Sequence, residues 1–211
     1  MDAYNLIAAE WEASRKAPFP ALKLLLPEIS RRDRILDAGC GNGRNLVAIS
    51  SKCHEAYGID SSNEMLKNAR ERLAAKEVKN AAVVDGNILN LPFADSFFDK
   101  VFCIAVLHHL KGSQQSKALG EFWRVLCEGG ELCLTVWSEN RSNGLKERLV
   151  KWRGTSGRDV DRYYYFFRRD ELCRLIRNAG FKIIDSFDEK GGAKVGMTGA
   201  VNFCVLARKI G

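Results

Sequence analysis

A glycine-rich turn is the most informative chemical feature of the sequence. Residues 35–43 read Ile-Leu-Asp-Ala-Gly-Cys-Gly-Asn-Gly, an apolar run that ends in three alternate glycines. Glycines let a ligand approach the backbone closely, and a glycine turn between a strand and a helix is typical of nucleotide-binding sheets. The dinucleotide fingerprint differs, because Arg44 stands where its third glycine is expected. Asp37 would place a carboxylate beside a bound pyrophosphate, so the pattern favours a ligand that carries positive charge.

A second carboxylate extends this candidate site. Asp60 ends the short run 57–60 and follows Gly39 by 21 residues, where one carboxylate can accept hydrogen bonds from both hydroxyls of a ribose. S-adenosylmethionine (SAM) is a nucleoside with an ammonium and a sulfonium group and no phosphate. The two carboxylates therefore predict SAM as the cofactor.

With the glycine turn, Asp60 and the segment 85–93 in this order, the sequence resembles the class I SAM-dependent methyltransferases. The resemblance implies that Asn87 stands where these enzymes have an acidic residue that accepts from the adenine amine, and an amide oxygen can accept the same bond. It also implies that the SAM ammonium lies near the backbone carbonyl of Ala105. The predicted cofactor-binding residues are Asp37, Gly39, Gly41, Gly43, Asp60, Ser61, Asn87, Ile88 and Ala105.

The elements that must position these residues alternate between short apolar runs and helical periodicity, which predicts βαβ units and a parallel sheet. We expect an α/β, doubly wound, Rossmann-like class I methyltransferase fold with a mostly parallel seven-stranded sheet and an antiparallel edge hairpin, in a single domain over residues 1–211. Strands are expected at 34–38, 55–59, 81–84, 100–107, 131–137, 181–187 and 201–207. Helices are expected at 4–16, 44–51, 113–126 and 169–178, with a short one ending near Pro27 and another opened by a capping box at Ser61 and Glu64.

Two segments carry no regular pattern. Residues 139–162 are predicted to form a long basic connection with one helical turn at 145–152, and residues 191–199 a glycine-rich loop. Between Arg141 and Arg177 the chain has eleven Lys or Arg against five Asp or Glu, which accounts for most of the net charge of +7. Aromatic residues interleave with these charges, a mixture suited to phosphates and unstacked bases.

Three further segments resemble the eukaryotic tRNA wobble-uridine carboxymethyl methyltransferases. They are the opening segment 4–20 with Ser-Arg-x-x-Pro-Phe-Pro, the His108-His109 turn, and the late Arg-Tyr-Tyr of 162–164. Together with Asn202-Phe203 the resemblance covers nearly the whole chain. The sequence departs from the family at Tyr165, where the family has histidine, at Phe203, where it has tryptophan, and in the longer loop 191–199.

The resemblance implies methyl esterification of the carboxylate of 5-carboxymethyluridine in the anticodon loop of tRNA. A carboxylate with a pKa of about 4 is ionised at neutral pH and needs orientation rather than a general base. Arg15 and Arg162 are the predicted carboxylate ligands, with His109 as an additional donor and Tyr163 beside them. Arg15 could instead bind the carboxylate of SAM. The family also implies a small zinc-binding activator subunit as partner.

The composition of the chain bears on its cellular location and on metal binding. No apolar run approaches the roughly 18 residues of a membrane-spanning helix, and the acidic start does not suit a secretory signal, so we expect a cytoplasmic protein without a membrane partner. The seven cysteines include no Cys-x-x-Cys pair, and no metal site is predicted.

Other readings remain open at this level. A small-molecule methyltransferase of the quinone-precursor type would explain the cofactor motifs but not the basic segment. A non-catalytic SAM-binding partner subunit would present the same surface without turnover. An NAD oxidoreductase is disfavoured by the glycine spacing.

Overall fold

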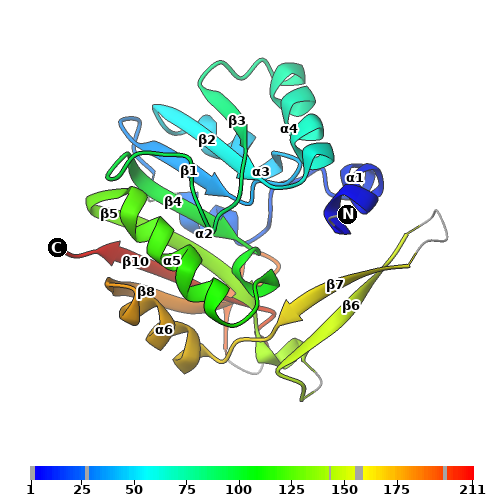
Figure 1. The fold of residues 1–211 in the computed structure, drawn as a ribbon, viewed down its shortest axis with the longest axis vertical. Helices are drawn as coiled ribbons and strands as arrows, with labels where there is room; N and C mark the ends of the chain where they lie inside the picture. Colours follow the sequence, from blue (N-terminus) through cyan, green and yellow to red (C-terminus); the bar gives the residue numbers. More distant parts are fainter. Residues whose placement is uncertain (1–2, 27–28, 143, 155–158, 197–198) are drawn as a thin grey trace.

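A central sheet of eight strands forms the body of the protein in the computed structural model, which describes residues 3–26, 29–142, 144–154, 159–196 and 199–211. The strand order is β3-β2-β1-β4-β5-β10-β8-β9 (Figure 1). The parallel strands are β1 (Arg34–Ala38), β2 (Glu55–Asp60), β3 (Ala81–Asp85), β4 (Phe98–Ile104) and β5 (Leu126–Trp137). The strand β10 (Asn202–Lys209) pairs antiparallel with β5 and with β8 (Phe181–Lys190), so β8 runs in the direction of β1 to β5. The short strand β9 (Ala193–Val195) pairs antiparallel with β8.

The doubly wound topology is confirmed, and the order reverses between β1 and β4, where such sheets bind ligands. The sheet has one strand more than predicted, because the loop after β8 contributes the short strand β9 at the edge. Residues 197 and 198 of that loop, and Pro27 at the predicted end of the short helix, lie outside the described residues.

Helices cover both faces of the sheet. The first apolar cluster contains Phe122 of α5 (Ser113–Val125) and Ile176 of α6 (Arg169–Asn178), which lie on one face (Figure 1). The second cluster joins α2 (Leu22–Leu25), α3 (Arg44–Ser50) and α4 (Asn63–Ala75) to β1, β4 and β5. The buried apolar stripes of these helices fix the sheet and therefore the carboxyl ends of its strands.

Helix α4 starts one residue later than the sequence predicts. Its N-cap is Ser62, whose hydroxyl accepts a hydrogen bond from the backbone N–H of Met65 at 3.3 Å. Ser61 is thereby left outside the helix and lines the cavity described below.

The segment 139–162 is not the irregular connection that the sequence suggested. It contains the 3-10 turn η3 (Glu139–Arg141) and the strand β6 (Glu147–Arg153), which pairs antiparallel with β7 (Asp159–Tyr165). The predicted helical turn at 145–152 is wrong, because burial alternates along β6 with the period of a strand. This β6–β7 ribbon projects from the sheet on the side of α1 (Ala3–Ser14) (Figure 1). None of the described helices is long and apolar enough to cross a membrane.

Candidate active site

A cavity of about 640 Å³ opens at the carboxyl ends of the parallel strands. Its walls come from α1, the glycine turn after β1, the ends of β2 to β5, and the β6–β7 ribbon. This volume is in the usual range for small-molecule sites. Among the described residues, no group of three or more His, Cys, Asp or Glu could hold a metal ion.

The glycine turn forms the floor of the cavity. Gly39 has φ +78°, and a Cβ built on it would lie 2.5 Å from a methyl of Val106. Gly41 has φ +52° and faces open space. The N–H groups of Gly39 and Cys40 both donate to the carbonyl of Ile59, at 2.8 and 2.9 Å. The turn is thus tied to β2, and its backbone at Gly41 stands open to a ligand.

Asp60 is held in a fixed orientation beside this turn. One carboxylate oxygen accepts from the N–H of Gly41 and the other from the N–H of Ser62, both at 2.9 Å. The side chain also lines the cavity, where a carboxylate can accept hydrogen bonds from a ribose.

Two of the predicted cofactor residues do not line the cavity. Asp37 is 1% exposed, and burial together with the neighbouring Asp60 raises its pKa to about 7. Its Oδ2 has no hydrogen-bond partner among the described residues. Gly43 packs on Ala69 of α4, since a Cβ there would lie 3.0 Å from the Ala69 Cβ. Asp37 can act on a cation through its field, and Gly43 lets α4 approach the turn.

The remaining predicted cofactor residues do line the cavity. The Asn87 side-chain oxygen accepts from the N–H of Leu89 at 2.9 Å, next to Ile88. Ala105 has φ +60°, uncommon for a residue with a side chain, and its N–H donates to both oxygens of Thr135. The structure therefore brings Gly39, Gly41, Asp60, Ser61, Asn87, Ile88 and Ala105 together around one space. The tight glycine turn, the oriented acid and the cavity size fit the adenosine and methionine parts of SAM.

The opposite end of the cavity is built around Arg162. This side chain is 7% exposed, and its guanidinium carbon lies 5.2 Å from the ring centroid of Trp152 and 6.0 Å from that of Trp11. One terminal nitrogen donates to the hydroxyl of Tyr164 at 2.7 Å, while Nε is buried without a partner. In the part of the chain that the structure describes, Arg162 forms no ion pair with a carboxylate. It is a buried cation held by aromatic rings.

Arg15 contacts the same two indole rings from the exposed end of α1. Its guanidinium carbon lies 5.6 Å from the Trp11 centroid and 5.7 Å from the Trp152 centroid. Arg44, which the sequence analysis did not select, also lines the cavity, and burial together with Arg15 lowers its pKa to about 10. Arg15 and Arg162 stay charged at neutral pH, so the end that holds the two indole rings favours anions. Arg44 instead follows the glycine turn and interacts electrostatically with Asp37.

His109 and Tyr163 lie together on the cavity wall. The His109 ring nitrogens are 2.8 Å from the Tyr4 hydroxyl and 2.9 Å from the Tyr163 carbonyl. Donation from His109 to a substrate would require one of these bonds to break. The Tyr163 hydroxyl donates to Glu147, and burial raises the Tyr163 pKa, so this hydroxyl is not a base at neutral pH. Both residues line the cavity.

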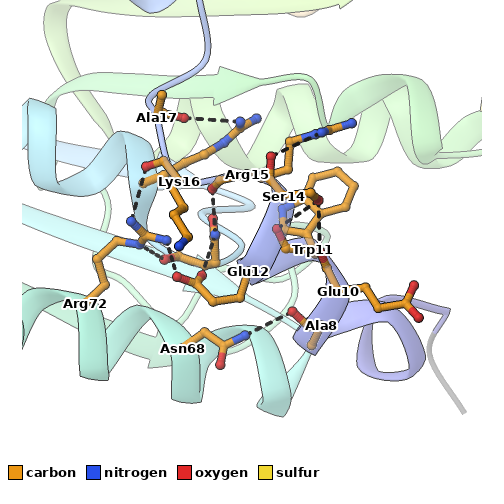
Figure 2. Close-up of polar contacts among 12 residues, drawn as sticks. Ala8, Glu10, Trp11, Glu12, Ser14, Arg15, Lys16, Ala17, Asn68 and Arg72 are labelled. Carbon is orange, nitrogen blue, oxygen red and sulfur yellow. Dashed lines mark hydrogen bonds and ion pairs between the residues drawn. The ribbon is translucent and has the colours of Figure 1, made fainter. Parts of the chain in front are cut away.

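Helix α1 is held against the glycine turn and α4 by polar contacts (Figure 2). Glu12 accepts from the amide of Asn42 at 2.7 Å and forms an ion pair with Arg72. The Asn68 amide donates to the carbonyl of Ala8 at 3.2 Å. These bonds place Tyr4 and Trp11 on the cavity wall.

Sequence reasoning did not select Tyr4, Trp11, Trp152 and Arg44 as site residues. The indole rings of Trp11 and Trp152 lie 5.3 Å apart although the residues are far apart in the chain. An amphipathic helix predicts that its aromatic residues are buried, but it does not show which partner they meet. The signals were the opening motif for Tyr4, the aromatic residues of the basic segment for Trp152, and for Arg44 its position directly after the glycine turn.

Comparison with known proteins agrees with this architecture. Residues 36–134 match the family described as a methyltransferase domain. A provisionally named methyltransferase of Encephalitozoon cuniculi is 32% identical over 199 residues, which cover 89% of each chain. A tRNA (carboxymethyluridine(34)-5-O)-methyltransferase of Arabidopsis thaliana is 32% identical over 161 residues, 76% of the present chain and 37% of the plant protein. The present chain thus spans little more than a third of that relative.

Solved structures show the same fold. An S-adenosylmethionine-dependent methyltransferase of Clostridium acetobutylicum superposes with a TM-score of 0.79 at 16% identity over the whole of both chains. A complex of the Haloferax volcanii Trm112 methyltransferase activator with a provisionally named methyltransferase gives 0.76 at 18% identity, covering 100% of this chain and 99% of that one.

Fold and cavity define a class I SAM-dependent methyltransferase, as the sequence predicted, with S-adenosylmethionine as cofactor. The chain belongs to the methyltransferase family.

Proposed function

We propose that this protein, acting in the cytoplasm as one domain over residues 1–211, methylates the carboxylate of 5-carboxymethyluridine at the wobble position of tRNA. The observation that carries the proposal is the buried, aromatic-lined Arg162 without a carboxylate partner in the described chain. A buried charge is costly unless it is paired. A substrate anion supplies the missing partner.

The geometry separates the two reactants by charge. Asp60, with Asp37 behind the turn, favours the cationic cofactor, and Arg162 with Arg15 favours the anionic acceptor. When bound, SAM supplies an electrophilic methyl group. The residues of the chain then have to hold the carboxylate in line and exclude water, which accounts for much of the assistance that such a transfer needs.

Aromatic side chains around the arginine end suit an unstacked base. Trp11, Trp152 and Tyr163 line the cavity, and Tyr163 is only partly buried. Single-stranded anticodon bases are read by stacking and edge contacts, whereas a small acid would leave these rings uncovered. The names of the plant relative and of a fission yeast relative, 25% identical over 86% of this chain and 88% of its own length, support a tRNA substrate.

We also propose a small zinc-binding activator as partner, supported by the archaeal complex with a methyltransferase of this fold. Strand β3 is the last strand of the sheet and pairs only with β2 among the described residues, and its Val83 and Val84 are only partly buried. Exposed edges of this kind are normally covered or protected.

Incubation of total tRNA with labelled SAM, with and without a candidate activator, followed by nucleoside mass spectrometry, tests the proposal. We expect label in the methyl ester of 5-carboxymethyluridine.

Asp60→Ala should abolish transfer together with SAM binding. Arg162→Ala should spare SAM affinity and remove transfer, and equal loss of both would contradict the role given to Arg162. Label in a small-molecule pool instead of tRNA would overturn the substrate assignment.

A further inference from the structure

The turn η2 (Leu107–His109) holds two consecutive histidines whose rings are bonded in opposite ways. The backbone N–H of Trp137 donates to Nδ1 of His108 at 3.1 Å. Nδ1 of His109 lies 2.9 Å from the carbonyl oxygen of Tyr163, which can only accept. These partners place a proton on Nδ1 of His109 and none on Nδ1 of His108.

The second nitrogen of His109 faces Tyr4. Its Nε2 lies 2.8 Å from the Tyr4 hydroxyl, and the two rings meet edge to face with centroids 5.5 Å apart. In a neutral His109 with the proton on Nδ1, Nε2 accepts the Tyr4 hydrogen. A protonated His109 would instead have to donate at both nitrogens.

Charged and titratable groups around this pair disfavour a second cation. From β7, Arg162 and Tyr164 interact with the Tyr4 hydroxyl, whose pKa is raised mainly by burial. Burial also lowers the pKa of His108, an effect to which His109, Arg141 and Arg162 add. Arg162 and Arg141 therefore lie near the two histidines, and no carboxylate among the described residues forms an ion pair with Arg162.

We propose that Tyr4 is a positioning residue that, together with the Tyr163 carbonyl, holds His109 as the neutral Nδ1–H tautomer beside the arginine end of the cavity. The effect of this tautomer on the substrate rests on the proposed function. The substrate carboxylate then meets the positive charge of Arg162 but not a second one from His109.

This arrangement favours the transfer chemically. As the bond from the methyl carbon to the carboxylate oxygen forms and its bond to sulfur breaks, the negative charge of the acceptor disappears. A cation that binds the carboxylate more strongly before the transition state than in it slows the step. A neutral His109 therefore leaves the substrate carboxylate nucleophilic. The His109 ring still forms part of the cavity wall.

Nitrogen NMR of the imidazole rings tests the assignment without a substrate. The chain has three histidines, and the exposed His54 serves as an internal reference. We expect His109 as the Nδ1–H tautomer and His108 as the Nε2–H tautomer, both unchanged from about pH 5.5 to 8. In Tyr4→Phe, His109 should gain a proton on Nε2 toward the acidic end of this range. A wild-type His109 that is protonated on Nε2 would overturn the proposal.

Kinetics separate positioning from packing. Tyr4→Phe should keep kcat within about threefold of the wild type at pH 8 and lose activity toward pH 5.5, by up to about tenfold, because a histidine of ordinary pKa is mostly protonated one unit below its midpoint. The wild type and the control Tyr57→Phe, whose ring packs on Phe93 outside the cavity, should show no such acidic loss. An equal loss at every pH would show a merely structural role and overturn the proposal. If the wild type methylates no tRNA while the tautomers are as expected, the proposed function fails and the assignment of His109 stands.

Discussion

Two carboxylates and two guanidinium groups divide the cavity into ends of opposite charge. Asp60 lies at the wall and Asp37 behind the glycine turn, whereas Arg15 and Arg162 share the Trp11–Trp152 pair. This layout suits a reaction that joins a cationic donor to an anionic acceptor, because each end repels the wrong reactant.

Asp37 should make the stability of the ligand-free protein depend on pH. Its pKa is about 7 in the folded chain, against about 3.9 when unfolded. Between these values the folded state binds more protons, so its stability should fall as pH rises through this interval. Asp37→Asn should therefore be more stable than the wild type at pH 8 by about 2–4 kcal/mol, with the difference vanishing near pH 4. Urea unfolding at both pH values checks this, with the exposed Asp85→Asn as control; parallel pH profiles for wild type and Asp37→Asn would contradict it.

A substitution at Gly39 tests whether the glycine turn must pack closely against Val106, which follows β4. Gly39→Ala must hold a side chain at positive φ and displace Val106, whereas Gly129→Ala has a similar φ of +74° with nothing within 4 Å. We expect Gly129→Ala to cost about 1 kcal/mol and Gly39→Ala about 2–4 kcal/mol, with weaker SAM binding only in the latter. Calorimetric titration with S-adenosylhomocysteine measures the difference. Similar affinities in both variants would argue against the turn as cofactor floor.

At the scale of elements, α1 is the part that completes the site. It brings Tyr4, Trp11 and Arg15 to the cavity, and Glu12 ties it to Arg72 and Asn42. Glu12→Gln should loosen this attachment at a cost of about 1–3 kcal/mol, raise the KM for tRNA and speed deuterium exchange over residues 3–14. Glu71→Gln, exposed on α4, is the matched control. Unchanged exchange over α1 in Glu12→Gln would refute the attachment.

The sheet and the glycine turn could be predicted because their signals are local. A buried parallel strand appears as an apolar run, and the turn is written in consecutive residues such as Gly39 and Gly41. The β6–β7 ribbon could not, because its inner face meets α1 and its outer face carries charges, which leaves no apolar run. Trp152 packs on Trp11, and its indole N–H donates to Glu10 at 2.8 Å, a pairing that no local pattern encodes.

At the scale of the molecule, ion pairs reduce the effective charge of the basic segment. The pairs include Lys146–Glu171, Lys151–Asp159, Arg168–Asp170 and Arg169–Asp188. In the described part of this segment Arg141, Arg148, Arg153, Arg174 and Arg177, besides the buried Arg162, form no such pair. With about five cations free for phosphates, the logarithm of the tRNA affinity should fall with the logarithm of salt with a slope of about −3.5 to −4.5. Fluorescence titration at several salt concentrations checks this, and a slope steeper than about −7 would show a far larger electrostatic surface.

The central claim is that Arg162 receives the carboxylate of the substrate. Its most direct test is the binding of two anticodon stem-loops in the presence of S-adenosylhomocysteine, one with 5-carboxymethyluridine and the other with the corresponding uncharged amide. The acid should bind the wild type at least about tenfold more tightly than the amide, as expected for a charge-assisted bidentate pair, and Arg162→Ala should bind both equally. Equal affinity of the wild type for acid and amide, or a preference for the acid that survives Arg162→Ala, would contradict the account.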